Sequence, residues 1–286
     1  MNVNEYIVGV IGAGLMGNGL VQLLTTTPDV KKIYWCSARK SDLSNQKSEL
    51  LNRINHLAKK GRIDSQIAQV ASDKLIIVRE FDALESCNFI HEVVSESINI
   101  KRDILIKLNE VKNPNALVAS NTSSISITEL AMSLSDPTKF IGMHFFNPAP
   151  LMKLVEIVAG YYTSKETEES IKVYCESLGK IPVVVSDAPG FIVNRMLMPM
   201  INEAVCILAD NVADRDCIDK AMKFGANHPI GPLALSDMIG NDVVLSIMEV
   251  LYDETGDQKY RPHPLLKKMV RAGRLGKKAN AGFYDY

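Results

Sequence analysis

The chain has 286 residues, of which 47% are hydrophobic and 23% charged, enough to bury the core of one large domain or two medium ones. With 32 basic and 33 acidic residues its formal net charge is −1, so we expect no general attraction for nucleic acid or for an anionic membrane surface. No apolar run approaches the roughly 18 residues of a membrane span, and no basic leader is seen. The five cysteines include no C-x-x-C pair, which argues against a disulfide framework and a metal site such as zinc, and fits a reducing, cytoplasmic location.

Apolar and amphipathic stretches alternate up to Asp187. Residues 6–11, rich in Val and Ile, predict a buried parallel strand; a glycine turn, a helix over 15–25 and a second strand over 32–36 follow. Further strand-like runs lie at 75–78, 88–94, 116–120, 140–146, 154–159 and 181–187, and helical spacing is found at 41–60, 99–112 and near 165–178. This alternation predicts an α/β domain over residues 1–187, with a Rossmann-type, doubly wound, mostly parallel sheet.

After Asp187 the pattern changes to helical runs, with at most a short strand at the C-terminus. These runs cover residues 190–210, 214–224, 232–255 and 262–272. We therefore predict a domain boundary near 186–189 and a second, all-helical C-terminal domain over residues 188–286.

The turn after the first strand carries the motif G-x-G-x-x-G as Gly12-Ala13-Gly14-Leu15-Met16-Gly17. In a strand–turn–helix context the first glycine allows the tight turn, the second lets the backbone approach a pyrophosphate, and the third lets the helix pack closely. The helix N-terminus then offers N–H groups to the phosphates. The motif predicts a dinucleotide site; the alternative is a bare tight turn.

The end of the second strand indicates which dinucleotide binds. An acidic residue there would hold the ribose 2′-hydroxyl of NAD(H), but this chain has Cys36 and Ser37, followed by Arg39 and Lys40. A serine with two nearby cations favours the 2′-phosphate of NADP(H), with NAD(H) as the alternative cofactor. It remains open that Arg39 and Lys40 only solvate the start of a helix.

Several segments are too specific for packing alone. They are GAGLMG at 12–17, SNTSSIS at 120–126, GMHFFNPAP at 142–150, KLVEIV at 153–158, DAPGFIVNR at 187–195 and GKKANAGFYDY at 276–286. With them the chain resembles, nearly end to end, the 3-hydroxyacyl-CoA dehydrogenase family, most closely its short bacterial 3-hydroxybutyryl-CoA dehydrogenases. The resemblance implies reversible hydride transfer between NAD(P)(H) and C3 of a short 3-hydroxyacyl-CoA, such as the pair 3-hydroxybutyryl-CoA and acetoacetyl-CoA. The acyl-CoA is the expected partner, and the resemblance also implies a homodimer formed through the helical domain.

The resemblance gives four residues catalytic roles. His144 would accept the hydroxyl proton, as suits an imidazole near neutral pH, and Glu156 would pair with it. Ser123 would bond the substrate's 3-oxygen, and Asn194 would orient the substrate carbonyl and Glu156. The alternatives are a core histidine, an outward-facing strand carboxylate, a helix cap and a surface asparagine. Spacing alone does not choose among the serines of SNTSSIS, and capping suits Ser124 or Ser126.

Further residues match the family's ligand-binding positions. Glu96, Lys101, Asn147 and Lys278 would bind the cofactor, and Arg53 and Lys60 the phosphates of CoA. Each could instead be an exposed surface residue. Two other functions are compatible with a dinucleotide site: that of a non-catalytic, crystallin-like dinucleotide-binding protein, and that of a dehydrogenase of free β-hydroxy acids, which would rely on a lysine base. The four catalytic residues argue against the first, and the HFFNP and NTSS segments against the second.

Overall fold

The computed structural model describes residues 5–38 and 42–286, and the chain divides into two compact units, residues 1–187 and 188–286. The first unit contains an eight-stranded sheet in the order β3-β2-β1-β4-β5-β6-β7-β8. Its strands are β1 (Tyr6–Ile11), β2 (Val30–Cys36), β3 (Leu75–Ile77), β4 (Phe89–Glu92), β5 (Leu117–Ser120), β6 (Phe140–Phe145), β7 (Leu154–Ala159) and β8 (Ile181–Ser186). Every neighbouring pair is parallel except β6 and β7, which are antiparallel. The predicted mostly parallel, Rossmann-type sheet is therefore confirmed.

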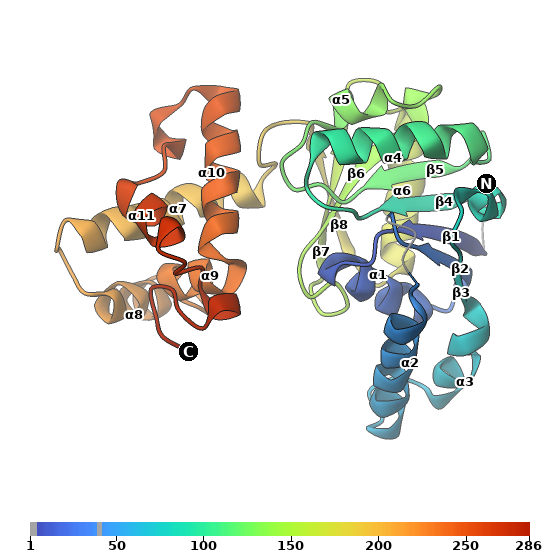
Figure 1. The fold of residues 1–286 in the computed structure, drawn as a ribbon, viewed down its shortest axis with the longest axis horizontal. Coiled ribbons are helices and arrows are strands. Elements are labelled where there is room, and N and C mark those ends of the chain that lie inside the picture. Colours follow the sequence, from blue (N-terminus) through green and yellow to red (C-terminus); the bar gives the residue numbers. More distant parts are fainter. Residues whose placement is uncertain (1–4, 39–41) are drawn as a thin grey trace. The chain divides into compact units, whose positions relative to one another are not determined.

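Helices lie on both faces of this sheet (Figure 1). They are α1 (Leu15–Thr25), α2 (Ser44–Lys59), α3 (Ser65–Lys74), α4 (Ile98–Val111), α5 (Ile127–Ala131) and α6 (Lys165–Ser177), with short 3-10 turns η1 (Phe81–Ser86) and η2 (Pro137–Lys139). Because both faces are covered, the central strands are apolar along their length: Val8, Val10 and Ile11 of β1 are all 0% exposed. Leu20 and Leu24 of α1 pack into the same core.

Two helices of the first unit, α3 and the short α5, were not predicted. α3 forms a pair with α2 that extends away from the sheet (Figure 1). Its start is marked by Asp64, whose side chain accepts a hydrogen bond from the Gln66 N–H at 2.8 Å. This capping signal was available in the sequence, but α3 is short and mostly exposed, so its apolar periodicity is weak.

The second unit is helical throughout its described residues, as predicted. It contains α7 (Val193–Ala209), α8 (Arg215–Gly225), α9 (Pro232–Ile239), α10 (Asn241–Thr255) and α11 (Pro264–Arg271), with the 3-10 turns η3 (Gln258–Tyr260) and η4 (Lys277–Ala279). Its core is formed by one face of α7, including Met198 and Val205, together with Val244 and Met248 of α10. None of the helices in the described ranges has the length and apolar character needed to cross a bilayer.

Two expectations for this unit are wrong. The helix predicted over 232–255 is two helices, because Gly240 between them has φ +107°, which an α-helix cannot include. The possible C-terminal strand is also absent from the described residues, where only isolated bridges occur. There the buried carboxylate of Asp237 accepts the N–H groups of Phe283 and Tyr284, at 2.9 and 2.8 Å, in place of a partner strand.

Candidate active site

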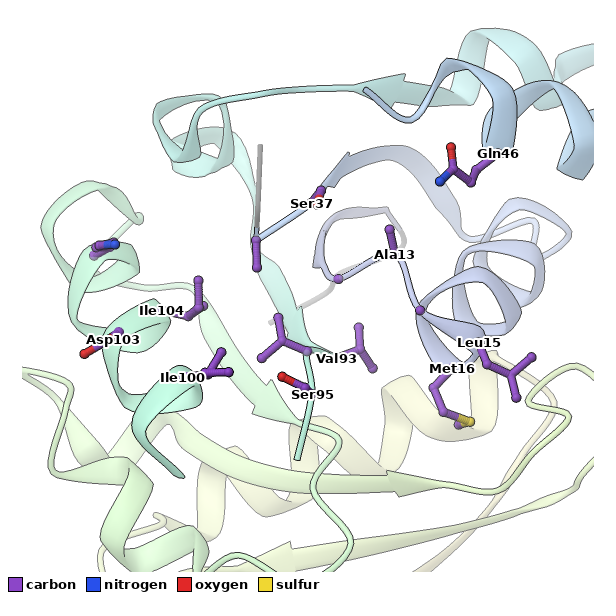
Figure 2. Close-up of a pocket in the computed structure, with 15 residues that line it drawn as sticks. Ala13, Leu15, Met16, Ser37, Gln46, Val93, Ser95, Ile100, Asp103 and Ile104 are labelled. Atoms are coloured by element: carbon purple, nitrogen blue, oxygen red, sulfur yellow. The ribbon is translucent and has the colours of Figure 1, made fainter. Parts of the chain in front are cut away.

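A cavity of about 760 Å³ opens at the carboxyl ends of β1, β2 and β4 (Figure 2). The strand order reverses between β1 and β4, and in open α/β sheets ligands bind at such a switch point. The lining residues come from the segments after these three strands and from α1, α2 and α4: Gly12, Ala13, Gly14, Leu15, Met16, Ser37, Ala38, Gln46, Val93, Val94, Ser95, Ile100, Asp103, Ile104 and Lys107.

The three motif glycines have different steric surroundings. Gly12 has φ +135°, and a Cβ there would lie 2.4 Å from the Val93 carbonyl oxygen. A Cβ on Gly17 would lie 2.3 Å from the carbonyl oxygen of Gly12, so the third glycine permits the helix to close onto the turn. A Cβ on Gly14 would meet nothing within 4 Å. The space beside Gly14 therefore suits a ligand that approaches the backbone, as the pyrophosphate of a dinucleotide does.

Two side chains outside the motif hold this turn in place. The indole N–H of Trp35, which is fully buried in β2, donates to the Gly12 carbonyl at 2.8 Å. The Asn18 side-chain amide donates to the carbonyls of Ala13, at 2.9 Å, and Gly14, at 3.1 Å. Neither residue was predicted. For Trp35 the reason is that its contact depends on the parallel pairing of β1 with β2.

The residues predicted to select the dinucleotide lie at the end of β2. Ser37 is 7% exposed and lines the cavity together with Gln46 of α2. Arg39 and Lys40 lie outside the described residues, so their predicted role stays a prediction.

The predicted histidine–glutamate pair is present. His144 and Glu156 stand directly opposite each other in the antiparallel pairing of β6 and β7, and Nδ1 of His144 lies 2.7 Å from Oε2 of Glu156. Both are buried, at 6% and 1% exposure, so the alternative of an outward-facing Glu156 is wrong. A Nδ1–H donated to the carboxylate fixes the tautomer and makes Nε2 the atom that exchanges a proton with a substrate.

The segment after β5 is held by Glu96. Its Oε1 accepts hydrogen bonds from the Thr122 hydroxyl at 2.7 Å, the Ser123 N–H at 2.8 Å and the Ser124 N–H at 3.0 Å. The Ser123 and Ser124 hydroxyls lie within 3.2 and 3.1 Å of the same oxygen. Burial alone would raise the pKa of Glu96, but the Lys101 ammonium and these hydrogen bonds outweigh it and hold the pKa below its ordinary value. Glu96 is thus an ionised anchor for the segment.

Capping explains another serine in this segment. The Ser126 side chain accepts a hydrogen bond from the Glu129 N–H and so caps α5, as the sequence pattern allowed for Ser124 or Ser126. Asp187 reinforces this end: its carboxylate accepts from the Ser126 hydroxyl at 2.8 Å and from the N–H groups of Ile127 and Thr128. Ser126 is therefore a structural residue.

The remaining predicted ligand residues have different environments. Lys101 is fully buried, which rules out the surface alternative, and its ammonium contacts Glu92 at 2.9 Å. Asn147 is exposed in the loop after β6, and Arg53 and Lys60 are exposed on α2 and at its C-terminal end.

Two predicted residues belong to the helical unit. Lys278 forms an ion pair with Asp242 at 2.6 Å. Asn194 lies in the first turn of α7 and is 8% exposed, so it is not the surface asparagine of the alternative interpretation.

A dinucleotide crevice in a doubly wound sheet, with a buried imidazole–carboxylate pair across β6 and β7 of the same sheet, defines a dinucleotide-dependent dehydrogenase. The family model for the NAD binding domain of 3-hydroxyacyl-CoA dehydrogenase matches residues 7–188, and the model for its C-terminal domain matches residues 190–286. The chain belongs to the 3-hydroxyacyl-CoA dehydrogenase family.

Individual relatives agree over nearly their whole length. The chain is 48% identical to a 3-hydroxybutyryl-CoA dehydrogenase of Clostridioides difficile, covering 97% of this chain and 98% of that protein. It is 44% identical to a 3-hydroxybutyryl-CoA dehydrogenase of Bradyrhizobium diazoefficiens, covering 98% and 94%. The crystal structure of an (S)-3-hydroxybutyryl-CoA dehydrogenase from Ralstonia eutropha superposes with a TM-score of 0.94 at 42% identity, covering 99% of each chain.

Proposed function

We propose that this protein catalyses reversible hydride transfer between a nicotinamide dinucleotide and C3 of (S)-3-hydroxybutyryl-CoA, with acetoacetyl-CoA as the oxidised partner. The observation that carries the proposal is the buried pair of His144 and Glu156, 2.7 Å apart, in the unit that contains the dinucleotide crevice. The names of the relatives support the substrate, because proteins called 3-hydroxybutyryl-CoA dehydrogenase match over nearly the whole chain.

The bound dinucleotide supplies the hydride acceptor or donor. In the oxidative direction, Nε2 of His144 takes the proton of the C3 hydroxyl as the hydride leaves. Glu156 keeps the imidazole in the required tautomer and stabilises the imidazolium that forms. The Ser123 hydroxyl bonds the substrate's 3-oxygen, and the family motif gives Asn194 the role of orienting the substrate carbonyl and Glu156. In the reductive direction His144 returns the proton to the developing alkoxide.

The proposed cofactor preference is NADP(H) over NAD(H). Cys36 and the buried Ser37 stand at the end of β2, where a carboxylate would repel a 2′-phosphate, and Arg39 and Lys40 follow in the sequence. A charge-assisted hydrogen bond contributes about 1.5–3 kcal/mol. At about 1.4 kcal/mol per tenfold change, this corresponds to a preference of about one to two decades. Glu96, Lys101, Asn147 and Lys278 complete the proposed cofactor site.

The CoA moiety is proposed to lie against α2. Arg53 and Lys60 are exposed there, so their cationic groups are accessible to the phosphates of CoA. Substituting Arg53 and Lys60 by Ala should raise the KM for acetoacetyl-CoA more than that for its truncated pantetheine thioester.

A homodimer formed through the helical unit is proposed for the assembly, and the cytoplasm for the location. Met196, Val212 and Phe224 of this unit are 71%, 74% and 81% exposed, and a second copy of the chain would cover such apolar side chains. Sedimentation equilibrium should give twice the mass of the chain.

The activity is tested by mixing the purified protein with acetoacetyl-CoA and following the oxidation of NADPH or NADH by absorbance. NADPH should be consumed faster; equal rates would refute the phosphate preference, and oxidation of neither would refute the activity. His144→Ala should abolish turnover and leave dinucleotide binding intact. His228→Ala, which changes a histidine of the helical unit, is the control and should keep full turnover.

A further inference from the structure

A second carboxylate, which the proposed reaction does not use, is completely buried at the end of β4. Glu92 is 0% exposed. Its oxygens accept hydrogen bonds from the Lys101 ammonium at 2.9 and 3.0 Å, the Ser120 hydroxyl at 2.5 Å and the Val94 N–H at 2.7 Å. A buried charge is costly unless it is paired and fully hydrogen-bonded, so this arrangement holds its partners in one geometry.

Lys101 links this carboxylate to the anchor of the serine segment. The ammonium is itself fully buried, and besides Glu92 it lies 3.7 Å from Oε2 of Glu96. The other oxygen of Glu96 accepts the hydrogen bonds from residues 122–124. The position of the ammonium, set by Glu92, therefore helps to set the position of Glu96.

Glu92 also contacts the start of the same segment directly. Glu92 and Ser120 are partners in the pairing of β4 and β5, and the backbone carbonyl of Glu92 accepts the Asn121 N–H at 2.9 Å. The side chain of Asn121 then accepts the Phe145 N–H at 2.8 Å, one residue from His144. The network thus reaches from Glu92 to Ser123 and to the strand of the histidine.

We propose that Glu92 is a positioning residue of the active site, which holds Lys101 and Ser120 so that Glu96 presents Ser123 to the C3 oxygen of the substrate. The inference rests on the proposed reduction of acetoacetyl-CoA. In Glu92→Gln the ammonium loses its anionic partner and moves toward Glu96, the neighbouring anion. Glu96 then turns away from residues 122–124, and the Ser123 hydroxyl is no longer held in place.

The test compares the wild type with four variants: Glu92→Gln, the double variant Glu92→Gln/Lys101→Met, Ser120→Ala and Glu168→Gln. Glu168 is the matched control, since this buried carboxylate on α6 also pairs with lysines, Lys165 and Lys172, but has no role in the site. For each protein, kcat and KM for acetoacetyl-CoA, the Kd for NADPH and the melting temperature are measured.

For Glu92→Gln we expect kcat at saturating NADPH to fall at least about tenfold, the effect of losing a hydrogen bond to a developing charge, while KM for acetoacetyl-CoA changes less than about threefold. The Kd for NADPH should rise as well, because Lys101 and Glu96 belong to the proposed cofactor site. Its melting temperature should also fall, because the Lys101 ammonium is left buried without its partner. The double variant should regain melting temperature but not kcat. Ser120→Ala, the mildest change, should lower kcat by about threefold with a nearly unchanged melting temperature, and it carries the test if Glu92→Gln does not fold. Glu168→Gln should keep the wild-type kcat.

A kcat within twofold of the wild type in Glu92→Gln overturns the inference about Glu92 but leaves the proposed function standing. The same holds for Ser120→Ala if Glu92→Gln does not fold. A kcat that recovers in the double variant together with the melting temperature also overturns it, since stability would then be the cause. An inactive wild type overturns the proposed function and this inference with it.

Discussion

Gly12 and Gly14 belong to the same turn, but replacing them by alanine should affect stability differently: Gly12→Ala should destabilise the protein, and Gly14→Ala should not. Gly14 has φ −73° and ψ −171°, an extended conformation open to any residue, and its Cβ would meet nothing within 4 Å. Gly12 has φ +135°, and its Cβ would lie 2.4 Å from the Val93 carbonyl oxygen. We therefore expect Gly14→Ala to fold like the wild type and Gly12→Ala to be destabilised.

The expected difference follows from these two environments. Alanine at a compatible position stabilises a protein by about 0.4–1 kcal/mol through the unfolded chain. Alanine at Gly12 costs about 1–3 kcal/mol in backbone strain, before the displacement of Val93 is added. The two variants should thus differ by roughly 1.4–4 kcal/mol. At about 2–4 °C per kcal/mol for a domain of this size, their melting temperatures should differ by roughly 3–16 °C.

Cofactor binding should separate from stability in the same pair. The methyl of Gly14→Ala occupies the space that a pyrophosphate would approach, so its Kd for NADPH should rise at least about tenfold although its melting temperature does not fall. Thermal melts and fluorescence titrations of both variants measure the two effects. Wild-type affinity in Gly14→Ala would refute the placement of the pyrophosphate, and a wild-type melting temperature in Gly12→Ala would refute the steric reasoning.

Three further predictions concern buried side chains. Glu156→Gln should lower kcat by about 10²–10⁴ and leave NADPH binding unchanged, since His144 loses its orienting carboxylate. Trp35→Phe removes the hydrogen bond to Gly12 and should raise the Kd for NADPH by about two- to twelvefold, measured by calorimetry. Burial lowers the pKa of His91 from 6.5 to about 3, so the unfolded chain binds more protons between these values and stability falls as the pH drops. His91→Gln should therefore lose less stability than the wild type between about pH 7.5 and 4.5, by roughly 2–3 kcal/mol in urea unfolding.

Near-normal turnover in Glu156→Gln would show that the carboxylate does not assist the histidine. An unchanged Kd in Trp35→Phe would show that the turn holds its shape without the indole. Equal losses of stability on acidification in the wild type and in His91→Gln would show that His91 does not remain neutral in the folded protein.

The amino-acid sequence was sufficient for the elements and the chemistry that depend on local pattern. Apolar, strand-like runs predicted all eight strands of the sheet, because strands covered on both faces must be apolar along their length. The glycine spacing predicted the turn at Gly12, and the resemblance to the family implied the pairing of His144 with Glu156. The prediction over 232–255 failed because Gly240 interrupts an otherwise continuous helical pattern with a conformation that periodicity does not reveal.

Tertiary structure alone decided which similar residues differ in role. His91 and His144 both lie in apolar runs, but His91 meets the hydroxyl of Tyr174 in the core, whereas His144 meets Glu156. The cause is strand register: β6 and β7 are antiparallel, which sets residues twelve apart in sequence side by side. Glu92 gave the same signal as Glu156, a carboxylate in an apolar strand, but only the pairing of β4 with β5 and the packing of α4 identify its partners. Sequence pattern therefore determined the elements and the reactive groups, and the register between distant strands decided which groups meet.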